Sequence, residues 1–208
     1  MPIPELPIVI LATSNEHKLR EIAAMLEGAP FRLTSLQEFP HITLPPETGS
    51  TFEENAAGKA VAATAASGLV VIGDDSGLEV NALHGEPGVW SARYAGPHAT
   101  DEENLQRLLQ ALDGVPEGER TARFVCAIAV ARPDGAVETV RGTCEGEIIR
   151  AKRGANGFGY DPVFLIPEDG RTLAEFSPAE KNRISHRSGA IQGALPLILR
   201  ALEDDKRS

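Results

Sequence analysis

Apolar residues occur along this chain in two patterns, short continuous runs and stripes at helical spacing. Continuous runs at residues 8–12 and 70–72 are bounded by polar residues or glycine, which predicts buried strands, and residues 31–36 are predicted to form a further strand. Apolar residues at positions 19, 22, 23 and 26 recur every three or four residues, so a helix is expected to follow the first strand. The first part of the chain is therefore predicted to be a βα unit.

A second helix is predicted after residue 50. Thr51 is expected to cap it, with Glu54 reaching back to complete a capping box, and Gly68 is expected to end it. Asn55 and Lys59 are four residues apart and share one helical face. This face is either a solvated polar stripe, or it looks toward an anion that Lys59 neutralises.

The second half of the chain has the pattern of a long β-hairpin. Residues 120–132 and 136–149 are β-rich, and Pro133-Asp134-Gly135 is a turn signal between them. Leucines at helical spacing after Thr100 predict a core-facing helix, and residues 189–202 predict a closing helix. No repeat or flexible linker interrupts the pattern, so residues 1–208 are expected to form a single α/β domain, with a long, twisted mixed sheet flanked by helices.

Composition narrows the classes of function. With 30 acidic against 20 basic residues the net charge is −10, which argues against a nucleic-acid binder with a broad basic surface but leaves room for a small anion in a local basic pocket. Of the two cysteines, Cys126 and Cys144, Cys126 lies in an apolar run and is expected to be a buried reduced thiol, with a structural disulfide as the alternative. No run of about 18 apolar residues and no leader-like N-terminus occur, which predicts a soluble cytoplasmic protein with no membrane partner.

Asp74 and Asp75 directly follow the strand predicted at residues 70–72. Ligands of open α/β sheets bind at the carboxyl ends of the strands, and adjacent carboxylates are best tolerated when a divalent cation lies beside them. Taken alone, Asp74-Asp75-Ser76-Gly77 is equally consistent with a solvated turn.

The polar turn between the first strand and the first helix has the geometry of a phosphate site. Backbone N–H groups and the positive end of a helix face an anion there, Lys18 adds a charge, and Ser14 or Asn15 is a credible N-cap. The residues of this candidate site are Thr13, Ser14, Asn15, Glu16, His17 and Lys18.

Two later segments carry aromatic and basic residues. Three glycines lie within residues 154–159, and Phe158 and Tyr160 beside them either stack on a nucleobase or pack into the core. Lys181, His186 and Arg187 belong either to an ordinary charged surface helix or to a set of hydrogen-bond donors for carbonyl or phosphate oxygens.

Taken together, the ordered motifs resemble the inosine triphosphate pyrophosphatase family of RdgB-type dITP/XTP pyrophosphatases, from residue 8 to about residue 190. The motifs that carry the resemblance are Thr-Ser-Asn-x-x-Lys, Thr-Phe-Glu-Glu-Asn-Ala-x-x-Lys-Ala, Asp-Asp-Ser-Gly-Leu, Gly-x-Pro-Gly-Val-Trp-Ser-Ala-Arg-Tyr-Ala-Gly, Phe-Gly-Tyr-Asp-Pro-x-Phe and Glu-Lys-Asn-x-x-Ser-His-Arg. Ser14 stands where many members have glycine.

The resemblance implies a fold, a reaction and an assembly. The fold would have two lobes with a nucleotide cleft between them, and the chain would form a homodimer. The reaction would be Mg²⁺-dependent hydrolysis of non-standard purine nucleoside triphosphates (ITP, dITP, XTP) to the monophosphate and pyrophosphate, which removes them from the nucleotide pool. Water would attack the α-phosphorus, and pyrophosphate would leave.

The resemblance also implies residue roles by matched position. Asp75 would accept the proton and bind Mg²⁺, Asp74 would support it at the metal, and Ser76 would contact the substrate. A further metal carboxylate is expected within residues 38–54, with Glu47 as a candidate. The triphosphate would be held by residues 13–18 and Lys59, and the base and sugar by Phe158, Gly159, Tyr160, Asp161, Lys181, His186 and Arg187.

Selectivity has a physical explanation in this scheme. Hypoxanthine and xanthine present a 6-keto acceptor where adenine presents an amino donor, so buried donors such as His186 and Arg187 would be left unpaired against adenine. Two other functions stay open at this point. One is a related pyrophosphatase for modified pyrimidines or methylated bases, and the other is a nucleotide sensor without catalysis.

Overall fold

The computed structural model describes residues 6–205, so the prediction about the N-terminus lies partly outside the described residues, in residues 1–5. Its strands form one sheet in the order β2-β1-β3-β4-β5-β6-β7. The strands are β1 (Ile8–Ala12), β2 (Arg32–Ser35), β3 (Val70–Val80), β4 (Thr121–Ala131), β5 (Val137–Ile148), β6 (Phe164–Ile166) and β7 (Arg171–Thr172). The helices are α1 (Glu16–Met25), α2 (Phe52–Ser67), α3 (Asp101–Ala111), α4 (Pro178–Ile184) and α5 (His186–Asp205).

The sheet is mixed, as the sequence predicted. β1 pairs in parallel with β2 and with β3, whereas β6 pairs antiparallel with β5 and with β7. β4 and β5 are neighbours, and the turn between them is closed by Arg132 N–H donating to Ala136 O and Gly135 N–H donating to Arg132 O. The predicted α/β class and the hairpin are therefore confirmed.

The chain forms two compact units, each built from separate segments. Unit 1 contains the chain up to Asp75, Ala127–Gly142 and the segment from Ser188 onward, and unit 2 contains Ser76–Cys126 and Thr143–Arg187. The three long strands β3, β4 and β5 each contribute residues to both units. That the whole chain acts as a single domain stays a prediction.

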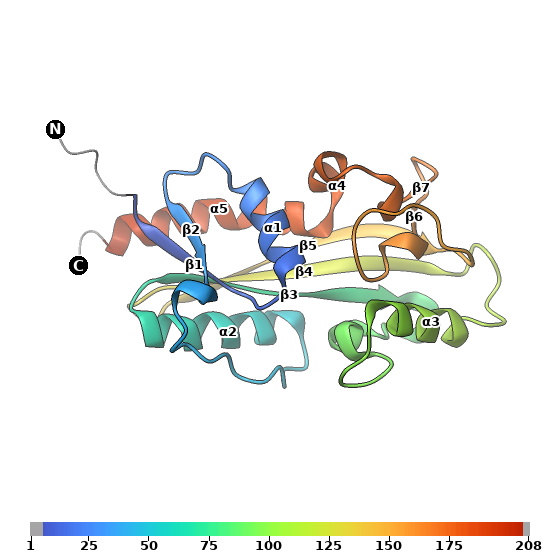
Figure 1. The fold of residues 1–208 in the computed structure, drawn as a ribbon, viewed down its shortest axis with the longest axis horizontal. Coiled ribbons are helices and arrows are strands. Elements are labelled where there is room, and N and C mark those ends of the chain that lie inside the picture. The colour runs from blue at the N-terminus through green and yellow to red at the C-terminus, as the bar shows by residue number, and fades with distance from the viewer. Residues whose placement is uncertain (1–5, 206–208) are drawn as a thin grey trace. The chain divides into compact units, whose positions relative to one another are not determined.

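In unit 1, helices pack directly on buried strands. Val9, Ile10 and Leu11 of β1 are fully buried, as are the alanines on one face of α2. α2 approaches β3 so closely that a Cβ on Gly73 would lie 2.1 Å from Ala56 O, and a Cβ on Gly193 of α5 would lie 2.6 Å from the Val140 side chain on β5. Figure 1 shows α2 and α5 on opposite faces of these strands. Glycine at position 73 is therefore required where α2 meets the sheet.

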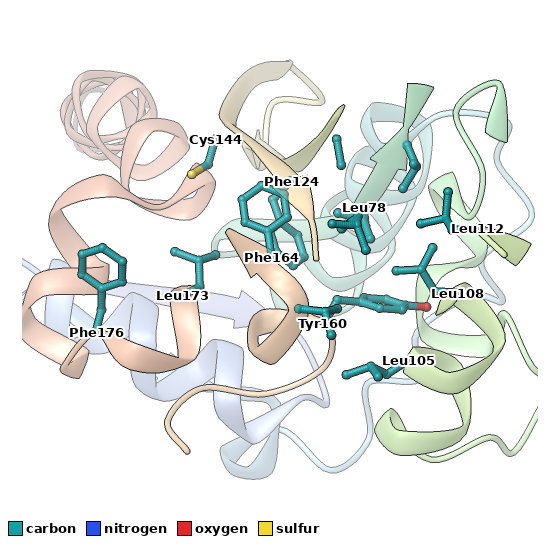
Figure 2. Close-up of a cluster of buried hydrophobic side chains, with 14 residues drawn as sticks. Leu78, Leu105, Leu108, Leu112, Phe124, Cys144, Tyr160, Phe164, Leu173 and Phe176 are labelled. Atoms are coloured by element: carbon teal, nitrogen blue, oxygen red, sulfur yellow. The ribbon is translucent and has the colours of Figure 1, made fainter. Parts of the chain in front are cut away.

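In unit 2, a hydrophobic core fills the space around β3, β4 and α3. Leu78 of β3, Phe124 of β4 and the α3 leucines Leu105 and Leu108 all belong to it (Figure 2). The α3 stripe that the sequence predicted to be core is therefore confirmed, and Thr100 caps α3 in a complete capping box with Glu103. Cys126 and Cys144 are buried free thiols, as expected.

Two boundary predictions need correction, and one helix cap is more extensive than predicted. The strand expected to end at residue 72 continues to Val80, so Asp74 and Asp75 lie within β3. The Thr51 hydroxyl caps α2 as predicted, and the Glu54 carboxylate, besides interacting with the Thr51 backbone, accepts from the N–H and Oγ of Ser50. The closing helix begins at His186, three residues before the predicted start.

Candidate active site

Asp74 and Asp75 lie where the parallel part of the sheet ends. The register of β1 with β3 stops at Ala12 opposite Gly73, so the next two residues of β3 extend past their β1 neighbour. Their relative exposures are 0% and 5%, which rules out the solvated turn. Successive strand residues point to opposite faces. Accordingly, Asp74 contacts Lys18 of α1, and Asp75 contacts Asn55 and Lys59 of α2.

The turn before α1 is arranged differently from the predicted phosphate site. Asn15 is the N-cap, and its Oδ1 accepts from the N–H groups of His17 and Lys18, while Thr13 Oγ1 accepts from the N–H of Asn15. These three amides already have local acceptors, so this turn offers an anion less free backbone than the sequence predicted. The Lys18 ammonium lies 2.6 Å from Asp74 Oδ1.

The remaining predicted residues of this turn are on the surface. Ser14, Glu16 and His17 are exposed. Arg20, one turn along α1, donates its Nε–H to the Glu16 carbonyl oxygen and places Nη2 3.1 Å from His17 Nδ1. Of this group, Lys18 is the residue whose contact with the buried carboxylates is established.

Lys59 is the centre of a buried charge cluster in unit 1. Its Nζ lies 2.8 Å from Glu47 Oε1 and 3.6 Å from Asp75 Oδ1, and its side chain is 7% exposed. Asn55, one helical turn earlier, donates Nδ2–H to Asp75 Oδ2 at 2.9 Å. The face of α2 with Asn55 and Lys59 is therefore not a solvated stripe, because it covers Asp75.

The electrostatics of this cluster follow from burial and from pairing. Burial raises the pKa of the Asp75 carboxyl, and the nearby Lys59 and Lys18 charges and the Asn55 hydrogen bond only partly offset this effect. Burial alone would lower the pKa of Lys59, but the charges of Asp75 and Glu47 outweigh it, and the pKa lies above its usual value. The Lys59 ammonium is therefore held in its charged form.

The donors of the cluster suit a hard divalent cation. Asp74, Asp75 and Glu47 supply carboxylate oxygens, the ligands that Mg²⁺ prefers. Among residues 6–205, no three His, Cys, Asp or Glu side chains are arranged to hold a metal ion. Instead, Lys18 and Lys59 balance the carboxylates.

Unit 2 gathers a second set of predicted residues around Phe158. Lys181 Nζ lies 2.5 Å from Asp161 Oδ2, and both side chains are at most 5% exposed. The same carboxylate oxygen accepts the Phe158 N–H at 2.9 Å, and a Cβ on Gly157 would lie 2.1 Å from it. Asp161 therefore fixes the glycine-rich loop, and Lys181 Nζ lies 4.8 Å from the centre of the half-buried Phe158 ring.

Arg187 and His186, at the start of α5, complete this second set. Arg187 is 1% exposed, donates Nη2–H to Ser76 Oγ at 3.0 Å, and has its Cζ 5.9 Å from the Phe158 ring centre. The His186 ring stacks on Phe124 with centroids 4.9 Å apart. Both residues are thus part of a buried array and not of a charged surface helix.

Tyr160 is the one predicted stacking residue that the structure places elsewhere. Its ring packs in the unit 2 core beside Leu105 and Leu108, and its hydroxyl donates to the Ser91 carbonyl oxygen (Figure 2). Its side chain therefore cannot stack on a base. The neighbouring Gly159 N–H donates to Asp101 Oδ2 at the start of α3.

Sequence reasoning did not place Asn55 among the site residues and left Glu47 as a candidate. The spacing of Asn55 could have identified it as a site residue, because it stands four residues before the predicted site residue Lys59 on the same helical face. Glu47 stands in an irregular loop, where no periodicity relates it to other residues. Only its contact with Lys59 brings it into the cluster.

Comparison with known proteins agrees with this fold. The family model described as the Ham1 family matches residues 9–197, and the chain belongs to this family. A protein of Desulforamulus reducens named dITP/XTP pyrophosphatase is 47% identical over 192 residues, which cover 92% of this chain and 96% of that protein. A protein of the same name from Geobacillus kaustophilus is 52% identical over 88% of this chain and 90% of its own length.

A solved structure shows the same fold. The HAM1 protein from Coxiella burnetii superimposes with a TM-score of 0.85 at 43% sequence identity, covering 94% of this chain and all of that one. The resemblance that the motifs predicted is confirmed.

Proposed function

We propose that this chain hydrolyses non-standard purine nucleoside triphosphates (ITP, dITP and XTP) to the monophosphate and pyrophosphate. Relatives that match about nine-tenths of the chain are named dITP/XTP pyrophosphatase. The observation that carries the proposal is the buried cluster of Asp74, Asp75 and Glu47 with Lys18 and Lys59. Such a combination of metal-binding oxygens and ammonium groups suits a polyphosphate and its cation.

In this proposal the two lysines and the carboxylates exchange partners when substrate binds. Asp75 and Glu47, which both lie beside Lys59, would hold Mg²⁺, with Asp74 supporting Asp75 from the other face of β3. When bound, Mg²⁺ neutralises phosphate charge and makes water more acidic. Lys18 and Lys59, released from the carboxylates, would then bind phosphate oxygens and stabilise the negative charge of the leaving pyrophosphate. The lysines thus keep the acids compensated in the free protein and bind the anion in the complex.

Asp75 is the residue that we assign to the attacking water. Its carboxylate is buried and oriented by Asn55. A carboxylate in such a place orients a water and accepts its proton as the water attacks the α-phosphorus. Because Asp75 would also bind Mg²⁺, which weakens a carboxylate as a base, its main contribution would be to orient the water.

The array around Phe158 is the part that we assign to the purine base. The half-buried Phe158 ring offers a stacking surface, and Lys181 and Arg187 are cations beside it. Hydrogen-bond donors can bond to a 6-keto oxygen. A 6-amino group is itself a donor, so it would face them without forming a hydrogen bond. Direct contacts of Ser76, Gly159 and His186 with substrate stay predictions.

The test of this function is the product released from a panel of nucleotides. We expect Mg²⁺-dependent release of pyrophosphate from ITP, dITP and XTP, with much slower release from GTP, ATP and dUTP and none in EDTA. Release of orthophosphate would show that water attacks the γ-phosphorus and would contradict the mechanism. Binding without turnover would instead indicate a nucleotide sensor.

The homodimer and the cytoplasmic location also stay predictions. Light scattering of the purified chain tests the first, and cell fractionation tests the second. No helix within residues 6–205 combines the length and apolar character needed to cross a membrane.

A further inference from the structure

Asn55 connects two parts of unit 1 that are far apart in sequence. Its Nδ2–H donates to Asp75 Oδ2 at 2.9 Å, and its Oδ1 accepts the Gly49 N–H at 2.8 Å. Gly49 lies two residues after Glu47, at the end of the irregular segment of residues 39–50, which we call the Glu47 loop. Asn55 itself is 5% exposed.

Only a side-chain amide satisfies both neighbours. The ionised Asp75 carboxylate requires a donor, whereas the Gly49 N–H requires an acceptor. These two demands fix which end of the Asn55 amide points to which partner. Aspartate at this position would supply only the acceptor, and leucine, which has a similar shape, would supply neither group.

The loop is shaped for this contact. A Cβ on Gly49 would lie 2.7 Å from Asn55 Oδ1 and 2.8 Å from Glu54 Cβ, so a larger residue would push the loop away from α2. One helical turn after Asn55, Lys59 bridges Glu47 and Asp75. The same face of α2 therefore ties the Glu47 loop to Asp75 at two successive positions, once by an amide and once by an ammonium.

We propose that Asn55 is a positioning residue for the reaction, which fixes the orientation of the Asp75 carboxylate and ties it to the Glu47 loop. The inference rests on the function proposed above. Holding Oδ2 of Asp75 fixes the direction of the second oxygen, Oδ1. A carboxylate that rotates freely would present the attacking water with a variable geometry, and the rate of the chemical step would fall. Asn55 acts through Asp75 and contacts no substrate.

Two variants separate orientation of Asp75 from simple anchoring of the loop. Asn55→Asp keeps an acceptor for the Gly49 N–H but loses the donor to Asp75, whereas Asn55→Leu loses both. We expect kcat for dITP at saturating Mg²⁺ to fall about 10- to 100-fold in both variants, as loss of a hydrogen bond to a buried charge predicts. KM should change less than about threefold, because uniform substrate binding is not altered.

Hydrogen exchange at the Gly49 amide supplies a readout independent of activity. This amide should stay protected in Asn55→Asp and exchange rapidly in Asn55→Leu. Ser50→Ala is the matched control, because it removes the hydroxyl bond from the Glu47 loop to Glu54 without any contact to Asp75. Its kcat should stay within about twofold of the unchanged protein.

The possible results distinguish the two proposals. Wild-type kcat in Asn55→Asp, with a protected Gly49 amide, would show that Asn55 only anchors the loop and would overturn the positioning role. A raised KM with unchanged kcat would overturn it as well, because it would place Asn55 against the substrate. If the unchanged protein releases no pyrophosphate from any nucleotide, the proposed function itself is refuted. If Asn55→Asp does not fold, an unchanged kcat in the uncharged Asn55→Leu, with a rapidly exchanging Gly49 amide, would also overturn the positioning role.

Discussion

The two units each bury charged side chains, but they balance them in opposite ways. In unit 1 three carboxylates, Asp74, Asp75 and Glu47, face two ammonium groups, Lys18 and Lys59. In unit 2 one carboxylate, Asp161, lies with Lys181, and the guanidinium of Arg187 lies near the same Phe158 ring. Unit 1 is therefore suited to gain a cation and unit 2 to receive acceptor atoms of a base.

The difference extends to the kind of neighbour that each charge has. The unit 1 charges pack against polar partners from α1, α2 and the Glu47 loop. In unit 2 the cations lie beside the Phe158 ring, and His186 stacks on Phe124. In the proposed function, the first arrangement would serve the phosphates and the second the flat base.

The largest effect is expected from Asp75→Asn. The amide retains the shape of the carboxylate but neither accepts a proton from water nor brings a charge to Mg²⁺, so kcat for dITP should fall about 100-fold or more. Pyrophosphate release measures the loss. Asp134→Asn is the control, because Asp134 is an exposed acid of the hairpin turn in the same unit. Retained activity in Asp75→Asn would remove Asp75 from the mechanism.

Lys59→Met should cause a large loss of stability. It removes the ammonium that lies between the buried Asp75 and the half-buried Glu47, and loss of one partner of a buried ion pair typically lowers the free energy of unfolding by about 3–5 kcal/mol. Urea unfolding without Mg²⁺ measures the change, and added Mg²⁺ should recover part of it. Lys152→Met, which breaks the exposed pair with Glu102, should cost about 1 kcal/mol or less. Equal losses in the two variants would contradict the buried-cluster interpretation.

Arg187→Ala should alter selectivity more than it alters the use of Mg²⁺. Removal of a buried donor beside Phe158 should lower the ratio of kcat/KM for dITP to that for dATP by about tenfold. The Mg²⁺ concentration for half-maximal rate should be unchanged. Arg123→Ala, which removes an exposed arginine paired with Glu79, serves as the control. An unchanged ratio in Arg187→Ala would reject its role at the base.

The smallest effect is expected at Glu180, which caps the helix that carries Lys181. Hydrogen bonds from Ser177 lower the pKa of Glu180 from 4.5 to about 2. A lowered pKa in the folded state adds stability that is complete above pH 4.5 and is lost as pH falls toward 2. Glu180→Gln should therefore have a lower Tm than the unchanged protein at pH 7, and the difference should vanish near pH 2. A difference that is constant with pH would contradict this assignment.

Several local features could be predicted because the signal for each lies within a few residues. Thr51, Thr100 and Gly68 mark helix ends as predicted, since caps depend on neighbouring backbone groups. The turn between β4 and β5 was predictable for the same reason. The extent of β3 was not, because the polar residues in its middle interrupt the apolar pattern and only pairing with neighbouring strands keeps them extended.

The candidate site was predicted as a set of residue types but not as a set of contacts. Phe158 and Tyr160 are two residues apart and were equivalent in the sequence, yet the packing of α3 places Tyr160 in the core and leaves Phe158 half-buried. The amides of the turn before α1 also looked available, and the Asn15 side chain occupies two of them. The burial of a side chain and the pairing of an amide depend on which groups come into contact in the folded chain.

The sequence by itself determined the α/β class, most element boundaries, the family and the identity of the two adjacent acids. Periodicity, caps and ordered motifs depend on residues that are close together in the sequence. Only the tertiary structure decided that Asn55 and Lys59 cover Asp75 and that Glu47 joins them. These contacts join residues 12 to 20 positions apart, and burial gives them their energetic weight. The partner of a buried charge can stand anywhere in the sequence. Local residue patterns therefore do not predict which residue it will be.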